Sequence, residues 1–501
     1  MGADAFQLQR TAEESLWPII DDLMRSHGLA GLVVAVVRDE VAVSRGFGVR
    51  DVGSREPVTP QTMFHLASVS KSFVATAVVG LARPRVGGRE KVLDLDAPIV
   101  EWVPEFRLAD GRAAEVTIRH LLTHTSGLPD VIDFGWHVPD LGDDALSRFV
   151  LSLSGSRLLT APGSAFSYCN AGFELLGLLL SKVSGQTFEA AVKRLVLDPV
   201  GMQRSTFLRA DVSADRAAAP HVAVPLMVPQ GRYPYTRSHA PSSTLHASAD
   251  ELCRWMLAVL AAIDPGGGPA VGGDHLDAAM LDAMWQPAVA VRDSPWEEAA
   301  GMGWFLGSYC GHRTVSHSGA DPGFGSKLVL LPDQRTGVVV LANSNTAPID
   351  ALVRAVLDCA LEVAGDQEPP TGGPGAADLS TLPPPGVGPV AAALAESGIE
   401  AAVATYDQLT RADPATVDLD DERFTDAVWG AIELHRTDLV WPLLQLWITL
   451  RPRSPRAWTM TGWAHKVDGR PEPAAEQLRR ALDLDPDNHD AALILRSLPP
   501  A

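Results

Sequence analysis

The 501-residue sequence has little of what marks several common protein classes. Its four cysteines lie far apart and form neither a CxxC pair nor a group of cysteine and histidine ligands, so they indicate free thiols rather than a disulfide framework or a zinc site. The longest apolar stretch is far shorter than the roughly 20 residues that a membrane-spanning helix needs. The amino-terminal segment lacks a basic region followed by an apolar run, so we expect no secretion signal and a cytoplasmic protein.

Positive charge is also scarce. Lysine and arginine number 41 against 61 aspartates and glutamates, the net charge is -20, and no basic cluster stands out. Phosphate backbones and anionic lipids would repel such a chain, so neither nucleic acid nor a membrane is an expected partner. The sequence also lacks a GxGxxG motif opening a helix, a GxxxxGK[ST] loop, an HExxH pair and a GxSxG elbow. We therefore expect no cofactor and no metal.

Strand-like runs gather at the two ends of the first 366 residues. The runs lie at 31–38, 41–49, 304–309, 313–318, 326–332 and 336–344. The first two read as a hairpin, and helical patterns fill most of the chain between the two groups. A sheet built from both ends of the chain with helices between them is an α/β sandwich, which we predict for residues 1–366.

The remainder of the chain reads as a linker followed by helical repeats. Residues 367–389 are dense in proline and glycine and predict a linker. Residues 390–501 read as helical, and similar residues recur 34 positions apart, as Trp429 and Trp463 do. This is the tetratricopeptide (TPR) period, but only two repeats are clear, with a degenerate third around 406–414, whereas such arrays need about three. We expect an all-α TPR-like module that leans on the first domain or on another subunit, and that either only caps it or docks a peptide or protein.

A serine and a lysine at helical spacing are the first candidate for chemistry. Ser68 and Lys71 open the helical run SFVATAVVGLA, and residues three apart share one face of a helix. A serine hydroxyl becomes a nucleophile when a positioned base takes its proton, and a helix amino terminus stabilises the negative charge that then forms. Alone the SxxK pattern is weak, because 32 serines and six lysines in 501 residues give about 0.4 such tetrads by chance.

Two further motifs give this pair its context. Tyr168 and Asn170 form a YxN motif just before a helical run, and His317-Ser318-Gly319 closes the predicted strand 313–318. This ordered set resembles the SxxK, YxN and [KH]xG motifs of the serine β-lactamase-related family, which includes class C β-lactamases, penicillin-binding proteins, esterases and D-aminopeptidases. Connecting segments such as VTIRHLLTHTSGLPD and PGSAFSYCNAGFELLG look like the family as well, and the resemblance covers about residues 10 to 365.

The resemblance implies a fold and a reaction. The fold would be β-lactamase/transpeptidase-like, an antiparallel sheet flanked by helices with a helical subdomain. The protein would be a serine hydrolase that acts through an acyl-enzyme on an ester, an amide or a D-amino-acid peptide bond. Ser68 would be the nucleophile and Lys71 and Tyr168 would handle its proton, and the sequence leaves open which of the two is the base.

The resemblance also implies a set of substrate-binding residues. Asn170 would orient Lys71 and the substrate, and the backbone amides of Ser68 and Ala320 would form the oxyanion hole. The strand residues that would line the substrate are His317, Ser318, Gly319 and Ala320. Relatives that act on penicillins usually carry lysine where this chain has His317, whereas esterase relatives often carry histidine, so a carboxylate-bearing β-lactam is a poorer candidate substrate.

Other residues offer competing interpretations. Ser70 and Ser72 are alternative hydroxyls near Lys71, and His124 is an alternative base that we expect to be a structural, buried histidine. Residues 220–244 are expected to lie over the pocket and to set the acyl-group preference. Two other functions stay open, namely thioesterase or cyclase release of a carrier-bound peptide docked on the helical module, and a catalytically silent scaffold that presents this module.

Overall fold

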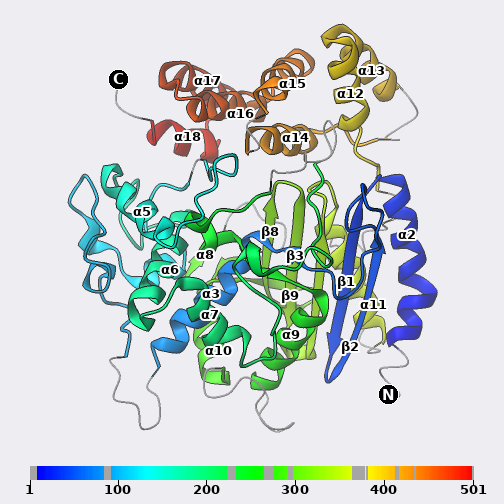
Figure 1. Ribbon diagram of the computed structural model, residues 1–501. Helices are drawn as coiled ribbons and strands as arrows, with labels where there is room; N and C mark the ends of the chain where they lie inside the picture. Colours follow the sequence, from blue (N-terminus) through cyan, green and yellow to red (C-terminus); the bar gives the residue numbers. More distant parts are fainter. Residues whose placement is uncertain are drawn as a thin grey trace.

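The computed structural model describes most of the chain. The described residues are 8–83, 92–131, 133–222, 233–263, 276–291, 297–363, 379, 382–411, 417–433 and 436–498. Most of the predicted linker 367–389 and part of the segment 220–244 lie outside them. Figure 1 shows a group of helices, drawn in yellow to red, stacked above the part of the chain that contains the main sheet.

The main sheet joins the two ends of the first 363 residues, as the sequence predicts. Eight strands follow the order β2-β1-β10-β9-β8-β7-β6-β5, and every neighbouring pair is antiparallel. They are β1 (Gly31–Arg38), β2 (Val41–Gly48), β5 (Val289–Ala290), β6 (Ala299–Ala300), β7 (Phe305–Tyr309), β8 (His312–Asp321), β9 (Phe324–Leu331) and β10 (Thr336–Ala342). A separate pair joins β3 (Phe64–His65) to β4 (His246–Ala247).

The central strands are apolar on both faces because both faces are covered. Successive side chains of a strand point to opposite sides, so Val33, Ala35 and Val37 of β1 enter one core while Leu32 and the other even-numbered residues enter a second. This double burial explains why β1, β9 and β10 read as continuous hydrophobic runs.

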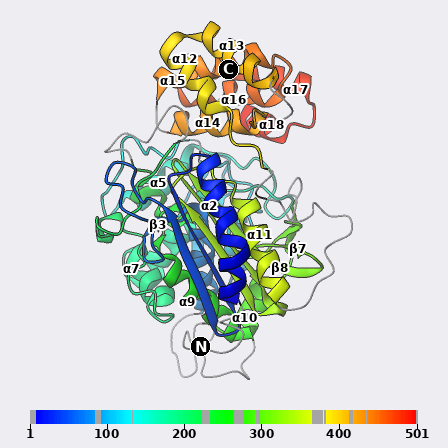
Figure 2. The same ribbon diagram turned by 90° about the vertical axis from the view of Figure 1, so that its right-hand side faces the viewer.

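Helices close the two faces of the sheet. The helices of this part of the chain are α2 (Trp17–Ser26), α3 (Ser70–Leu81), α4 (Ile118–Leu122), α5 (Ala145–Ser152), α6 (Asn170–Ser184), α7 (Phe188–Val192), α8 (Ala240–Ser243), α9 (Ala249–Ile263), α10 (Ala278–Met284) and α11 (Ile349–Val363). Figure 2 shows α2 and α11 side by side over one face, where they share a core with the even-numbered residues of β1. On the other face α3, α6, α9 and α10 share the larger core. The predicted fold, an antiparallel sheet flanked by helices, is confirmed.

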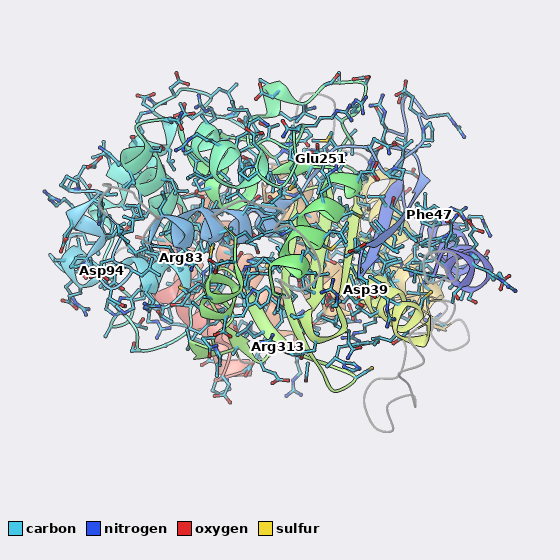
Figure 3. The ribbon with its side chains drawn as sticks, turned by 90° about the horizontal axis from the view of Figure 1, so that it is seen from below. Asp39, Phe47, Arg83, Asp94, Glu251 and Arg313 are labelled. Carbon is cyan, nitrogen blue, oxygen red and sulfur yellow. The ribbon has the colours of Figure 1, made fainter. Side chains whose placement is uncertain are left out.

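The hairpin between β1 and β2 lies at the bottom of the molecule, away from the helical module. Figure 3, a view from below, shows Asp39 at its turn and Phe47 on β2. Asp39 has a positive φ of 51° and accepts a hydrogen bond from Arg335 Nε at 2.9 Å. Phe47 packs edge to face on Trp17 with their ring centroids 5.6 Å apart, which fixes α2 on the sheet.

The helical module keeps the 34-residue period. Its helices are α12 (Val387–Ser397), α13 (Ile399–Arg411), α14 (Asp421–Glu433), α15 (Thr437–Leu450), α16 (Pro455–Val467), α17 (Pro471–Leu484) and α18 (His489–Arg496). The helices α12, α14, α16 and α18 begin 34 residues apart, and α12 packs on α13, α14 on α15 and α16 on α17. The degenerate repeat is therefore a helix pair, α12 and α13. Residues of α12 to α16 share one core, and α17 and α18 pack around a second, smaller one.

Two segments after residue 366 contact the first domain, namely the predicted linker and, beyond it, the module. Leu379 is buried in the core that α2 and α11 share, and Leu382 packs against it. On α14, a Cβ added to Gly430 would lie 3.2 Å from Val222 Cγ1 and 3.7 Å from Asn345 Nδ2, so the α14 backbone packs directly against these two side chains. The module thus leans on the sheet-containing domain, as expected. Within the described residues, no helix is long and apolar enough to cross a bilayer.

A chain truncated after residue 366 tests the separation of the two parts. Every sequence-predicted site residue precedes the truncation, so we expect the truncated chain to keep any small-ester turnover to within about tenfold, or 1.4 kcal/mol in the barrier. Loss of the Leu379 contacts should lower the melting temperature, which circular dichroism would measure. A truncated chain that is folded but inactive would mean that the module forms part of the active site.

Candidate active site

Ser68 stands out by its exposure. It lies on a single 3-10 turn (Ala67–Val69) that leads into α3, and it is the one residue between Thr62 and Val79 that is not buried. In a 3-10 turn the side chains of residues three apart are aligned, so Lys71 at the start of α3 falls beside Ser68. The hydroxyl is therefore presented to solvent on an otherwise inaccessible segment.

Several contacts hold the Ser68 turn against the sheet. Ala67 has a positive φ of 46°, an uncommon conformation for a residue with a Cβ and one that collects at functional sites. Ser326 Oγ of β9 donates to Leu66 O at 2.7 Å. Gly319 of β8 fits because it has no side chain: a Cβ there would lie 2.4 Å from Leu66 O and 2.8 Å from Ser68 N.

Lys71 is the buried partner of Ser68. Its side chain is fully buried, and Nζ donates to Ser68 Oγ at 2.8 Å and to the carbonyl oxygen of Ser242, on α8, at 2.8 Å. Burial lowers the pKa of Lys71 to about 8, while the carboxylates of Glu174 and Asp130 oppose this shift. A lysine with such a pKa can exchange a proton with a hydroxyl near neutral pH.

Tyr168 is the third member of the cluster. Its ring lies 5.0 Å from Lys71 Nζ, and a hydrogen bond joins it to Ser68. Burial raises the pKa of Tyr168 well above its usual value, so the phenol stays protonated. The structure thus brings Ser68, Lys71 and Tyr168 together, as the sequence predicts.

His124 packs against the ring of Tyr168. The two rings stack at 4.3 Å, and His124 Nδ1 accepts a hydrogen bond from the backbone amide of Cys169 at 3.1 Å. Burial lowers the pKa of His124 well below its usual value, so it is neutral. These contacts are those of a residue that positions the Tyr168 loop.

Asn170 is tied to a residue that the sequence analysis missed. Asp130 accepts two hydrogen bonds from Asn170, from the backbone amide at 2.6 Å and from Nδ2 at 3.0 Å. These bonds fix the amino terminus of α6 and hold the side-chain amide of Asn170 in place. The segment VTIRHLLTHTSGLPD carries Asp130 at its end, but nothing in the residue type alone marks it as the partner of Asn170.

His317 is neutral and lies inside its strand. The sequence analysis ended this strand at residue 318, but β8 continues to Asp321 because Gly319 and Ala320 pair with Ser326 and Gly325 of β9. Burial lowers the pKa of His317 to about 3. Its Nδ1 lies 2.7 Å from Ser318 O and must carry the hydrogen, so Nε2 is a bare acceptor with no protein partner among the described residues.

The remaining strand residues flank the Ser68 turn. Ser318 is partly exposed, Gly319 is buried and Ala320 is exposed. Gly319, the residue before Ala320, lies directly against Ser68 N.

The hydroxyls of Ser70 and Ser72, the alternative nucleophiles, form buried hydrogen bonds to the backbone. Ser70 Oγ is buried and accepts from Leu245 N at 2.9 Å, and Ser72 Oγ is buried and donates to Gly303 O at 3.0 Å. Both hydroxyls are therefore out of contact with solvent, in contrast with Ser68.

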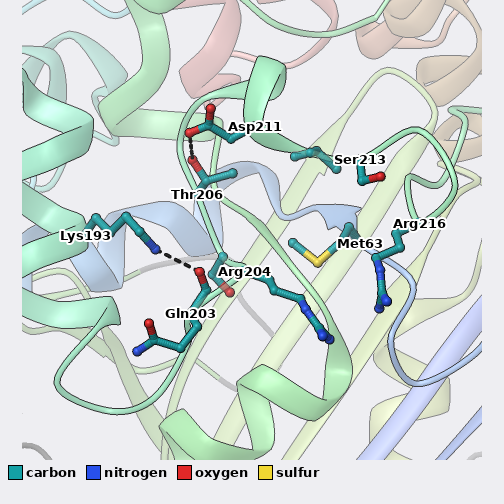
Figure 4. Close-up of a pocket in the computed structure, with 10 residues that line it drawn as sticks. Met63, Lys193, Gln203, Arg204, Thr206, Asp211, Ser213 and Arg216 are labelled. Carbon is teal, nitrogen blue, oxygen red and sulfur yellow. Dashed lines mark hydrogen bonds between the residues drawn. The ribbon is translucent and has the colours of Figure 1, made fainter.

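Two cavities lie away from this cluster. One, of about 310 Å³, is lined by Met63, Lys193, Gln203, Arg204, Ser205, Thr206, Asp211, Val212, Ser213 and Arg216, most of which Figure 4 labels. The other, of about 250 Å³, lies between α5, α6 and α7. Neither is lined by Ser68, Lys71 or Tyr168. Across the described part of the chain, no three histidine, cysteine, aspartate or glutamate side chains are grouped to hold a metal ion.

Residues 18–360 match the family model described as Beta-lactamase. Among curated proteins, the chain is 37% identical over 217 residues to esterase EstB of Burkholderia gladioli, covering 40% of this chain and 53% of the esterase. It is 25% identical over 349 residues to protein flp of Staphylococcus aureus strain COL, covering 69% of this chain and 66% of that protein. The matches thus span about half to two thirds of the length of these relatives.

Solved structures agree on the fold. The octameric penicillin-binding protein homologue from Pyrococcus abyssi superposes with a TM-score of 0.59 at 26% identity, covering 70% of this chain and 77% of that one. The D-amino acid amidase from Ochrobactrum anthropi SV3 superposes with a TM-score of 0.56 at 22% identity, covering 73% of this chain and 99% of the amidase, and shares the fold.

Proposed function

Because the chain belongs to the beta-lactamase family, we propose that it is a serine hydrolase that cleaves an ester, an amide or a D-amino-acid peptide bond through an acyl-enzyme on Ser68. One observation carries the proposal. Ser68 is the single accessible residue of a buried segment, and its hydroxyl is hydrogen-bonded to a fully buried lysine amine. A nucleophile next to a group that can take its proton is the arrangement that acyl transfer needs.

The pKa values favour Lys71 as the base. Its neutral form is accessible near its pKa of about 8, whereas Tyr168, whose pKa is raised, keeps its proton. In the proposed acylation Ser68 Oγ attacks the carbonyl carbon and its proton passes to Lys71 Nζ. The bond to the leaving group then breaks, Tyr168 gives that group a proton, and Lys71 returns one to Tyr168. Water attacks the acyl-enzyme by the reverse route and releases the acid and free Ser68.

The negative charge that forms on the carbonyl oxygen needs donors. The backbone amides of Ser68 and Ala320 are the proposed oxyanion hole, which the close approach of Gly319 to Ser68 N and the exposure of Ala320 support. Asn170 is proposed to bind the substrate through its Oδ1, because Asp130 occupies its Nδ2.

His317 favours substrates without a carboxylate at that position. A neutral, fully buried imidazole supplies no positive charge to pair with a substrate carboxylate. The proposal is therefore an ester or amide without a carboxylate at that position, rather than a penicillin. The similarity to an esterase points the same way.

Two other functions stay as weaker proposals. A silent scaffold would not need an accessible Ser68 hydroxyl on a buried lysine, so the geometry favours an enzyme. Release of a carrier-bound peptide would use the same acyl-enzyme with the helical module as docking surface. The three helix pairs of that module supply a surface of the right kind for a protein or peptide partner.

Replacing Ser68 tests the nucleophile. Ser68→Ala removes one partly exposed hydroxyl, so we expect p-nitrophenyl acetate turnover to fall by more than about a hundredfold while the melting temperature stays close to that of the parent. Ser70→Ala is the matched control. It should cost about 1 kcal/mol of stability through the bond to Leu245 but keep the activity. Retention of more than about a hundredth of the activity by Ser68→Ala would refute the assignment.

The pH dependence tests the base. Lys71 must be neutral to accept a proton, so kcat/KM should rise with pH through about 8 and level off above it. The neighbouring histidines, His124 and His317, have lowered pKa values and should add no step near 6.5. A stopped assay across this pH range measures the profile, and a single rise centred near 6.5 would indicate a histidine base instead.

A further inference from the structure

Below Lys71 lies a buried carboxylate that the reaction above does not use. Glu174 is one helical turn after Asn170 on α6 and is fully buried. Its Oε1 accepts a hydrogen bond from Ser242 Oγ at 2.6 Å and lies 3.1 Å from His239 Nδ1. Its Oε2 is buried and has no hydrogen-bond partner among the described residues.

Ser242 connects this carboxylate to the lysine. Its hydroxyl bonds to Glu174, and its carbonyl oxygen accepts the bond from Lys71 Nζ at 2.8 Å. A shift of Glu174 would therefore move α8 and the acceptor that orients the amine. The hydroxyl of Ser68 holds the other side of the same amine.

Burial of the Glu174 carboxylate is unfavourable unless a nearby positive charge compensates for it. Glu174 interrupts the apolar run AGFELLGLLL, whose leucines fill the larger core. A buried carboxylate with an unpaired oxygen costs several kcal/mol unless a cation nearby compensates for it. Two basic side chains face it: His239, whose Nδ1 lies 3.1 Å from Oε1, and Lys71, whose pKa Glu174 raises more than any other charged group does.

Other titratable groups near the Lys71 amine lie on two loops and on strand β8. The loop before α5 contributes His124 and Asp130, the loop before α6 contributes Tyr168 and Cys169, and β8 contributes His317 and Asp321. The histidines and Tyr168 are neutral, for their pKa shifts oppose the charged forms. The carboxylates Glu174, Asp130 and Asp321 are left to balance Lys71.

We propose that Glu174 is a positioning residue for the acyl transfer proposed above: through Ser242 it holds the Lys71 amine against Ser68, and its charge stabilises the protonated amine. The inference rests on the proposed function only for its catalytic consequence. Without Glu174 the amine would lose its proton at lower pH, so the pH at which Lys71 becomes a base is set by a residue outside the three motifs.

Glu174→Gln separates charge from hydrogen bonding. A glutamine can accept the same bond from Ser242, so a purely structural role predicts little change. The chain has only six lysines, so ¹³C-labelled lysine in the full-length protein gives few NMR signals, and Lys71→Met assigns the one of interest. We expect the titration midpoint of Lys71, about 8 in the parent, to fall by roughly one pH unit in Glu174→Gln. The rise of kcat/KM should move to lower pH by the same amount.

Glu251→Gln is the matched control. Glu251 is also buried, on α9, where it accepts bonds from Ser205 Oγ at 2.5 Å and from Arg204 N at 2.9 Å. Its replacement should leave the Lys71 midpoint unchanged. Should Glu174→Gln fail to fold, Glu174→Leu, which matches the neighbouring leucines of α6, removes the charge and the bond to Ser242 together and should also lower the Lys71 midpoint.

The outcomes separate the two proposals. An unchanged or raised Lys71 midpoint in Glu174→Gln overturns the role of Glu174, whatever the activity. A lowered midpoint without a shift of the kinetic profile supports the role of Glu174 in stabilising the protonated amine. That second result would count against Lys71 as the base, and so against the proposed mechanism alone.

Discussion

The site depends on a lysine amine held inside the protein. Removing Lys71 from water favours its neutral form, and this brings the pKa of a strongly basic group down to about 8. Its hydrogen bonds to Ser68 Oγ and Ser242 O keep the ammonium form from being unsatisfied. A more exposed lysine would stay protonated, and one buried without partners would destabilise the fold.

The two parts of the first domain hold the amine from opposite sides. The sheet supplies the platform: β8 and β9 bind the Ser68 turn through the close approach of Gly319 and the Ser326 hydroxyl. The helical side supplies Tyr168, at the start of α6, and Ser242, on α8. Because both faces of the sheet are packed, the platform is rigid, so the geometry of the reacting groups is set before substrate binds.

Residue spacing could predict the reacting groups but not their supports. The SxxK spacing places Ser68 beside Lys71 on any helical turn, and the continuous hydrophobic runs of β1 and β10 are visible in the sequence. Asp130 and Glu174 could not be assigned, because their roles come from contacts 40 to 68 residues away, with Asn170 and Ser242. The predicted end of strand β8, at residue 318, was wrong. Gly319 and Ala320 have little intrinsic preference for strands, but their pairing with β9 extends β8 beyond that residue.

The central claim, acyl transfer through Ser68, is tested most directly by locating the serine that a covalent probe of serine hydrolases modifies. The full-length protein is incubated with a fluorophosphonate, digested, and analysed by tandem mass spectrometry. The account predicts one modified tryptic peptide, that of residues 56–71, with the added mass on Ser68. Modification of another serine, or none by a folded protein, would contradict it.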